Sequence, residues 1–155
     1  MTFQPCTIDH LPSLLALQDE AFSHLEDPSM LRRNTPEMIA QCLQAPHLTV
    51  GAFEKGRIVA FAILYIPQGE EVIMPGAANF KLCIVRPQHR GHGLQCQLGQ
   101  HIIAAAKARG YHRLCATASP HNTPSHRNLL RLGFTLDHTA THDGLARNVY
   151  TYEID

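Results

Sequence analysis

Apolar residues recur along the chain with two spacings, and these predict helices and strands in alternation. The helical spacing predicts one helix from Asp9, as its cap, to about His24, and another from Leu94 to the residue before Gly110. Two shorter helices are predicted where a Thr-Pro pair supplies an N-cap and a proline at the first helical position, over residues 35–44 and 123–133.

Seven segments rich in apolar and β-branched residues predict strands, and the pair Lys55-Gly56 predicts a hairpin between the second and third of them. The predicted strands are residues 3–8, 47–54, 57–66, 80–85, 112–118, 134–139 and 147–153. Their alternation with helices indicates a mixed α/β sheet (α+β) of about seven strands with helices on both faces. The length of 155 residues favours a single domain, residues 1–155.

Composition excludes several classes of protein. Thirteen Lys and Arg balance thirteen Asp and Glu, which argues against binding nucleic acid through a broad basic field. The longest apolar run, residues 58–67, is too short to span a membrane, and the N-terminus lacks the pattern of a signal peptide. The five cysteines, without a Cys-x-x-Cys spacing, are typical of a reduced protein, so a cytoplasmic location is expected. The eleven histidines lack metal-binding spacing, so no metal site is expected.

The turn between the predicted strand 80–85 and the next helix holds the clearest candidate chemistry. It reads Val85-Arg86-Pro87-Gln88-His89-Arg90-Gly91-His92-Gly93-Leu94-Gln95. Glycines let a backbone approach a ligand closely, and the unpaired N–H groups of a first helical turn attract anions. The segment predicts a site for a phosphate or pyrophosphate, with added charge from Arg90. A strand-to-helix turn that needs glycine for its conformation explains the spacing equally well.

This turn resembles the acyl-CoA-binding motif of the GCN5-related N-acetyltransferase (GNAT) superfamily, in the pattern Val85-x-Pro87-x-x-Arg90-Gly91-x-Gly93-Leu94. Its RGxGLQ sequence is similar to that of a group of uncharacterised bacterial members. A second motif, Asn122-x-x-Ser125 followed by residues 129–132 and Gly133-Phe134, resembles a later helix and strand of the family. Two motifs in order are more specific than either alone, and the resemblance covers nearly the whole chain.

The resemblance implies a GNAT-like fold in which strand 82–85 splays from its neighbour and opens a cleft for acetyl-CoA, the cosubstrate. Backbone groups of Cys83 and Val85 would bind the pantetheine arm as an added strand does. The backbone of the turn would hold the pyrophosphate through Arg90, Gly91, His92, Gly93, Leu94 and Gln95. A later helix would contribute Asn122, Ser125, Arg127 and Asn128 to the CoA site.

The implied reaction is transfer of an acetyl group to a primary amine, of a small molecule or a peptide, by direct attack in a ternary complex. Because the amine must be neutral to attack, a base is needed, and Glu71 and Glu70 in the loop 67–78 are the candidates. The plain alternative is that both are solvated loop acids. The family's tyrosine acid is replaced by Leu129, so either Ser125, Asn128 or a water donates the proton, or no acid is needed because a thiolate is a modest leaving base. Leu129 also keeps open a non-catalytic acyl-CoA-binding sensor or partner subunit.

Three further expectations concern the surroundings of the cleft. Cys83 and Cys115 lie on apolar strands and should behave as small hydrophobic side chains, with Lys81 as a cation on the same strand face as Cys83. The acceptor should lie among residues 24–35, 67–78 and 138–147, whose mixed charges identify no acceptor. A homodimer is suggested by the family, with the strand 148–154 as an edge that can pair.

Overall fold

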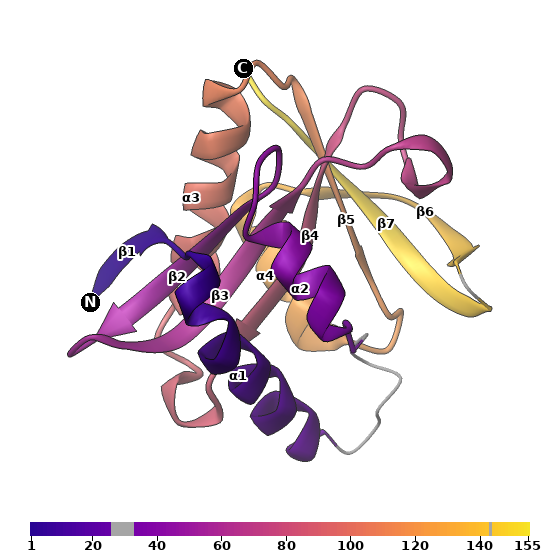
Figure 1. The fold of residues 1–155 in the computed structure, drawn as a ribbon. Helices are drawn as coiled ribbons and strands as arrows, with labels where there is room; N and C mark the ends of the chain where they lie inside the picture. Colours follow the sequence, from indigo (N-terminus) through magenta and orange to yellow (C-terminus); the bar gives the residue numbers. More distant parts are fainter. Residues whose placement is uncertain (26–32, 143) are drawn as a thin grey trace.

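The sheet has seven strands in the order β1-β2-β3-β4-β5-β7-β6 in this computed structural model, which describes residues 1–25, 33–142 and 144–155 (Figure 1). Neighbouring strands are antiparallel except β4 and β5, which are parallel. The predicted mixed sheet is confirmed. The strands are β1 (Thr2–Pro5), β2 (Leu48–Glu54), β3 (Arg57–Tyr65), β4 (Ala78–Val85), β5 (Arg113–Ala118), β6 (Thr135–His142) and β7 (Leu145–Glu153).

Helices cover both faces of the sheet, as predicted. They are α1 (Leu11–Ser23), α2 (Pro36–Cys42), α3 (Leu94–Ala108) and α4 (Thr123–Leu132). One core joins α1 and α2 to β3 through side chains such as Leu17, Ile39 and Phe61. The other joins α3 and α4 to the opposite face, where Leu98 and Ala62 are fully buried. Within the described ranges, no helix is long and apolar enough to cross a membrane.

The chain departs from the predicted boundaries at both ends. The first strand ends at Pro5 because Thr7 begins a 3-10 turn, in which the Nδ1 atom of His10 accepts a hydrogen bond from the backbone N–H of Thr7 at 2.9 Å. Asp9 therefore lies inside this turn, and His10 is the N-cap of α1. At the other end, β6 and β7 are longer than predicted because their antiparallel pairing continues to the pair of His142 with Leu145.

The expectation that residues 148–154 offer a free strand edge is wrong. These residues belong largely to β7, which pairs with β5 on one side and with β6 on the other. The chain turns back after β6 and inserts β7 between two strands, so the edges of the sheet are β1 and β6. The homodimer itself stays a prediction.

The strands β4 and β5 separate soon after they meet (Figure 1). They pair at Ala78 with Leu114 and at Asn79 with Cys115, and their pairing ends there. In β4, Phe80 pairs with Leu64 whereas Leu82 pairs with Ile63, which leaves Lys81 as the extra residue of a β-bulge. A bulge bends its strand and increases the local twist. The predicted splay of the central strands is confirmed, and the bulge lies where it begins.

The bulge also corrects the expected placement of Lys81. Its ammonium lies 4.7 Å from the ring centroid of Tyr65, whose side chain belongs to the core under α1 and α2. Cys83 packs instead against the core under α3 and α4. The extra residue breaks the alternation of the strand, so Lys81 and Cys83 do not share a face.

Candidate functional site

Three cavities follow one another through the opening between β4 and β5. The turn cavity lies beside the loop that precedes α3, the middle cavity lies at the opening, and the outer cavity lies beyond it toward α2 and the loop 67–78. The cavities are adjacent, because neighbouring ones share lining residues. The turn and middle cavities share Cys83, Gln95, Asn122, Ser125 and Asn128, and the middle and outer cavities share Asn34, Ile73, Asn79, Lys81, Thr117 and Arg147.

The turn cavity is built for an anion at the start of α3. Gly91 and Gly93 have φ values of 81° and 79°, a conformation that favours glycine. A Cβ atom added at either position would meet no atom within 4 Å, so the backbone faces open space. Gly93 is the N-cap, and the first turn contains no acidic residue. Its N–H groups and the positive end of the helix dipole can therefore hold a negative group.

Most of the predicted cofactor residues gather in this cavity. Its lining includes Cys83, Val85, Arg90, Gly91, Gly93, Leu94, Gln95, Asn122, Ser125 and Asn128. His92 and Arg127 are exposed and do not belong to the lining. Arg131 does line it, three residues beyond Asn128 on the same face of α4. Helical spacing from Ser125 and Asn128 points to Arg131, a signal that was available in the sequence. The end of α1 adds Ala21 and Leu25, which no motif indicated.

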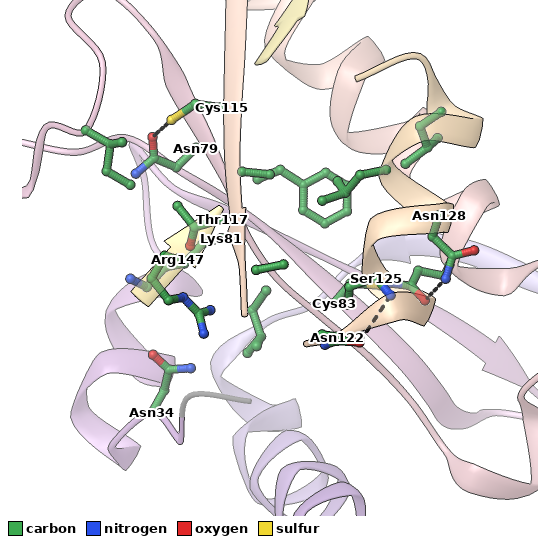
Figure 2. A pocket seen from close by; sticks show the side chains of 18 residues that line it. Asn34, Asn79, Lys81, Cys83, Cys115, Thr117, Asn122, Ser125, Asn128 and Arg147 are labelled. Atoms are coloured by element: carbon green, nitrogen blue, oxygen red, sulfur yellow. Dashed lines mark hydrogen bonds between the residues drawn. The ribbon is translucent and has the colours of Figure 1, made fainter. Parts of the chain in front are cut away.

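Hydrogen bonds fix the walls of the turn cavity. Asn128 Nδ2 donates to Gln95 Oε1 at 2.6 Å and links α4 to α3. Asn122 is buried and caps α4, because its Oδ1 accepts a hydrogen bond from the backbone N–H of Ser125 at 3.2 Å (Figure 2). On β4, the Nε–H of Arg90 donates to the carbonyl of Val85 at 3.4 Å. The carbonyl of Val85 has two lone pairs, so it can accept a second hydrogen bond from a ligand beside Arg90.

The middle cavity contains thiols that are poor nucleophiles at neutral pH. Burial raises the pKa of Cys115 to about 11, and its Sγ–H donates to Asn79 Oδ1 at 2.9 Å (Figure 2). Burial, and to a smaller extent the nearby Cys96, raise the pKa of Cys83 to about 12. Both behave as the expected protonated, largely apolar groups. Leu129 lines the same cavity and is 7% exposed.

The outer cavity has charges of both signs arranged around Tyr65. The hydroxyl of Tyr65 donates to Glu71 Oε2 at 2.5 Å, and the backbone N–H of Gln68 donates to Glu71 Oε1 at 3.3 Å. Burial and the hydrogen bond to Glu71 raise the pKa of Tyr65, so the phenol stays protonated and holds the carboxylate in place. The charged lining residues are Arg33, Glu70, Glu71, Lys81 and Arg147.

All three segments in which the acceptor was expected contribute to this lining, and Lys81 of β4 joins them. Residues 33–35 represent the first segment, Glu70, Glu71 and Ile73 the second, and Arg147 the third. Residues 26–32 and 143 of those segments lie outside the described residues. In the described part of the chain, no group of three His, Cys, Asp or Glu side chains is arranged to hold a metal ion.

Comparisons with known proteins give one family model and a set of similar folds. The model of the acetyltransferase (GNAT) family matches residues 11–134. Similar solved structures include yncA from Salmonella typhimurium with its cofactor acetyl-CoA, at 19% identity and a TM-score of 0.79, covering 100% of this chain and 94% of that one. They also include the ribosomal-protein-alanine N-acetyltransferase of Brucella melitensis, at 21% identity and a TM-score of 0.80, covering 99% of both chains. These two likenesses concern the fold. No curated protein matched the chain.

Proposed function

The chain belongs to the acetyltransferase (GNAT) family and is an acyltransferase, and from this premise we propose that it moves an acetyl group from acetyl-CoA to a primary amine by direct attack in a ternary complex. The observation that carries this proposal is the passage formed by these adjacent cavities between β4 and β5, with a helix N-terminus suited to an anion at one end and a charged cavity at the other. Acetyl-CoA enters from the turn cavity, the amine from the outer cavity, and they meet in the middle cavity.

The turn cavity suits the charged and the extended parts of CoA. The N–H groups at the start of α3 and the open space at Gly91 and Gly93 match a pyrophosphate. The edge of β4 beyond Asn79 is not paired with β5, so backbone groups of Cys83 and Val85 can bond the amides of pantetheine as a neighbouring strand would. Gly93, Leu94 and Gln95 belong to the same binding segment, with Asn122 and Asn128 on the facing wall.

Three cations are candidates for the remaining phosphate contacts. Arg90 and Arg131 line the turn cavity, so both can approach the pyrophosphate directly. Arg127 is exposed on α4 outside the lining, and its contact with a CoA phosphate stays a prediction, as does the contact with the backbone of His92. Arg90 and Arg131 are the better candidates by position, since Arg127 points about 100° away from the Asn128 face of the helix.

The acceptor nitrogen must lose a proton. An alkyl amine with a pKa of about 10.4 is mostly protonated at pH 7, so a base must shift it toward the neutral form. We assign this role to Glu71 and Glu70, which line the outer cavity and can receive the proton through water. Glu71 is the better positioned, because Tyr65 and Gln68 hold its two oxygens.

The transfer then exchanges one bond for another. The amine nitrogen bonds to the acetyl carbonyl carbon, and the carbon–sulfur bond breaks. Backbone N–H groups of β4 near Val85 are the donors for the negative charge that develops on the carbonyl oxygen. Ser125 borders both the turn and middle cavities, so its hydroxyl can return a proton to the sulfur. A thiol of pKa about 8.5 is a good enough leaving group for water to serve in its place.

Thermal unfolding with and without acetyl-CoA tests the first half of the proposal. A ligand at one hundred times its Kd stabilises a protein by about 2.7 kcal/mol, which raises the Tm by several degrees. Desulfo-CoA should act similarly and ATP less. No shift at millimolar acetyl-CoA would refute the proposal. CoA release with a panel of amines tests the second half, and binding without release above hydrolysis would instead favour the sensor suggested by Leu129.

A further inference from the structure

Two cations lie where the middle cavity meets the outer cavity. Lys81 and Arg147 line both cavities, whereas Glu70 and Glu71 line the outer one. Figure 2 shows Lys81 and Arg147 on one side of β5, and Ser125 and Asn128 of the cofactor wall on the other. Among the described residues, Lys81 and Arg147 are thus the charged ones that line the middle cavity, and of these two cavities Glu70 and Glu71 line only the outer one.

The fold holds both cations in position. Lys81 is the extra residue of the bulge in β4, and its ammonium lies over the ring of Tyr65. Arg147 is half-buried in β7, where it pairs with Ala140 of β6. The side chains of Asn34 and Thr117 line the same junction and add neutral hydrogen-bonding groups. Lysine and arginine from different strands thus converge on one place in the passage.

A simple alkylammonium is a poor match for this junction, because two like charges repel it. An amine that carries a carboxylate beside its nitrogen is a good match. Arginine binds a carboxylate through two parallel hydrogen bonds, and lysine adds a point charge. The same cations lower the pKa of the adjacent amine and increase its neutral, nucleophilic fraction.

We propose that the acceptor is a small α-amino acid, whose carboxylate is bound by Arg147 and Lys81 while its amino group faces the middle cavity. This inference rests on the proposed function. The amino acid side chain extends into the outer cavity, of about 520 Å³, a size typical of sites for small molecules. A peptide N-terminus carries an amide in place of the carboxylate and so loses the charged contact.

Matched pairs of acceptors test the proposal. The pairs are leucine and 3-methylbutylamine, phenylalanine and phenethylamine, and histidine and histamine, with kcat/KM measured by CoA release. Arg147→Gln should lower kcat/KM for the preferred amino acid by about 10- to 100-fold, the effect of a charged hydrogen bond, and change its matched amine less than about threefold. The comparison between variants cancels differences in amine basicity within a pair. Arg57→Gln, exposed at the start of β3, is the matched control and should change neither.

Two outcomes distinguish failure of the amino acid inference from failure of the proposed acetyl transfer. If amines are acetylated equally with and without a carboxylate, or an alanyl peptide is preferred, the inference is wrong and the proposed function stands. If acetyl-CoA binds but nothing is acetylated, the transfer proposal fails. Calorimetry of amino acids on the CoA-loaded protein then decides: binding that Arg147→Gln removes supports the carboxylate site, and absent or unchanged binding overturns it. Lys81→Gln replaces Arg147→Gln if that variant fails to fold.

Discussion

A carboxylate at Gly93 should abolish tight binding of acetyl-CoA while the protein stays folded. Gly93 is the N-cap of α3 with a φ of 79°, and an added Cβ would meet no atom within 4 Å. A side chain in this left-handed conformation costs about 1–2 kcal/mol of stability. An aspartate at a helix N-terminus interacts favourably with the dipole and offsets part of that cost. The effect on folding is therefore small.

The effect on binding is large. At a distance of about 6 Å and an effective dielectric constant of about 20, a carboxylate repels each unit charge of the pyrophosphate by about 3 kcal/mol. Because about 1.4 kcal/mol corresponds to a factor of ten, the Kd should rise at least about 100-fold. Gly93 is exposed, so added salt should reduce the difference.

Calorimetric titration of Gly93→Asp, Gly93→Ala and Gly56→Asp with acetyl-CoA separates charge from strain. Gly56 lies in the turn between β2 and β3 with a φ of 77° and the same open space, which makes it a matched control. Gly93→Ala should lose affinity by a few fold, and Gly56→Asp should bind as the wild type does. If Gly93→Asp binds within threefold of Gly93→Ala, the anion site is not at this turn.

Three further outcomes are expected. Leu129→Ala should leave kcat within a few fold, because Leu129 offers no proton; a loss beyond about a hundredfold in steady-state assays would mean that its packing positions the thioester. Gly99→Ala should lower the free energy of unfolding by about 1–3 kcal/mol, because the new Cβ would lie 2.4 Å from Cδ1 of Leu132. In thermal unfolding, the double variant with Leu132→Ala should recover part of this loss. No recovery would mean that α3 and α4 are not in contact at these two residues. The folded protein holds the proton of Cys83 to about pH 12, whereas an ordinary thiol loses it near 9.0, so stability should fall as the pH rises above about 9. Cys83→Ala should flatten that decline in alkaline denaturation curves, and an unchanged slope would contradict the burial of the thiol.

Patterns within a few residues of sequence predicted the turns and helices whose conformation depends on those same residues. The Lys55-Gly56 turn is an example, because both residues have positive φ and the hairpin needs that twist. The helix faces are another, since the buried positions Leu94, Leu98 and Ile102 of α3 follow the helical spacing. The length of β6 and β7 was missed because their ends mix apolar and polar residues that are largely exposed, and the strands continue there through pairing with each other.

The same distinction applies to the site. The turn cavity was predictable because residues 90–95 lie together in one motif. The segments around the outer cavity followed from the family resemblance, but the place of Lys81 among them did not. The face of β4 on which Lys81 lies depends on a bulge, and no residue type in β4 predicts that bulge. The alternation of a regular strand therefore predicts the wrong face for Lys81.

The brief pairing of β4 with β5 divides the sheet mechanically. Two residue pairs, at Ala78 and Asn79, join a plate made of β1 to β4 to a plate made of β5, β7 and β6. Besides these pairs, the contact between α3 and α4, where Gly99 lies beside Leu132, connects the helices that cover one face of the sheet. A pantetheine arm bound along β4, as proposed above, would lie in this gap in the position of an added strand. On the proposed function, binding of acetyl-CoA is therefore expected to couple the two plates more tightly, and its release to loosen them.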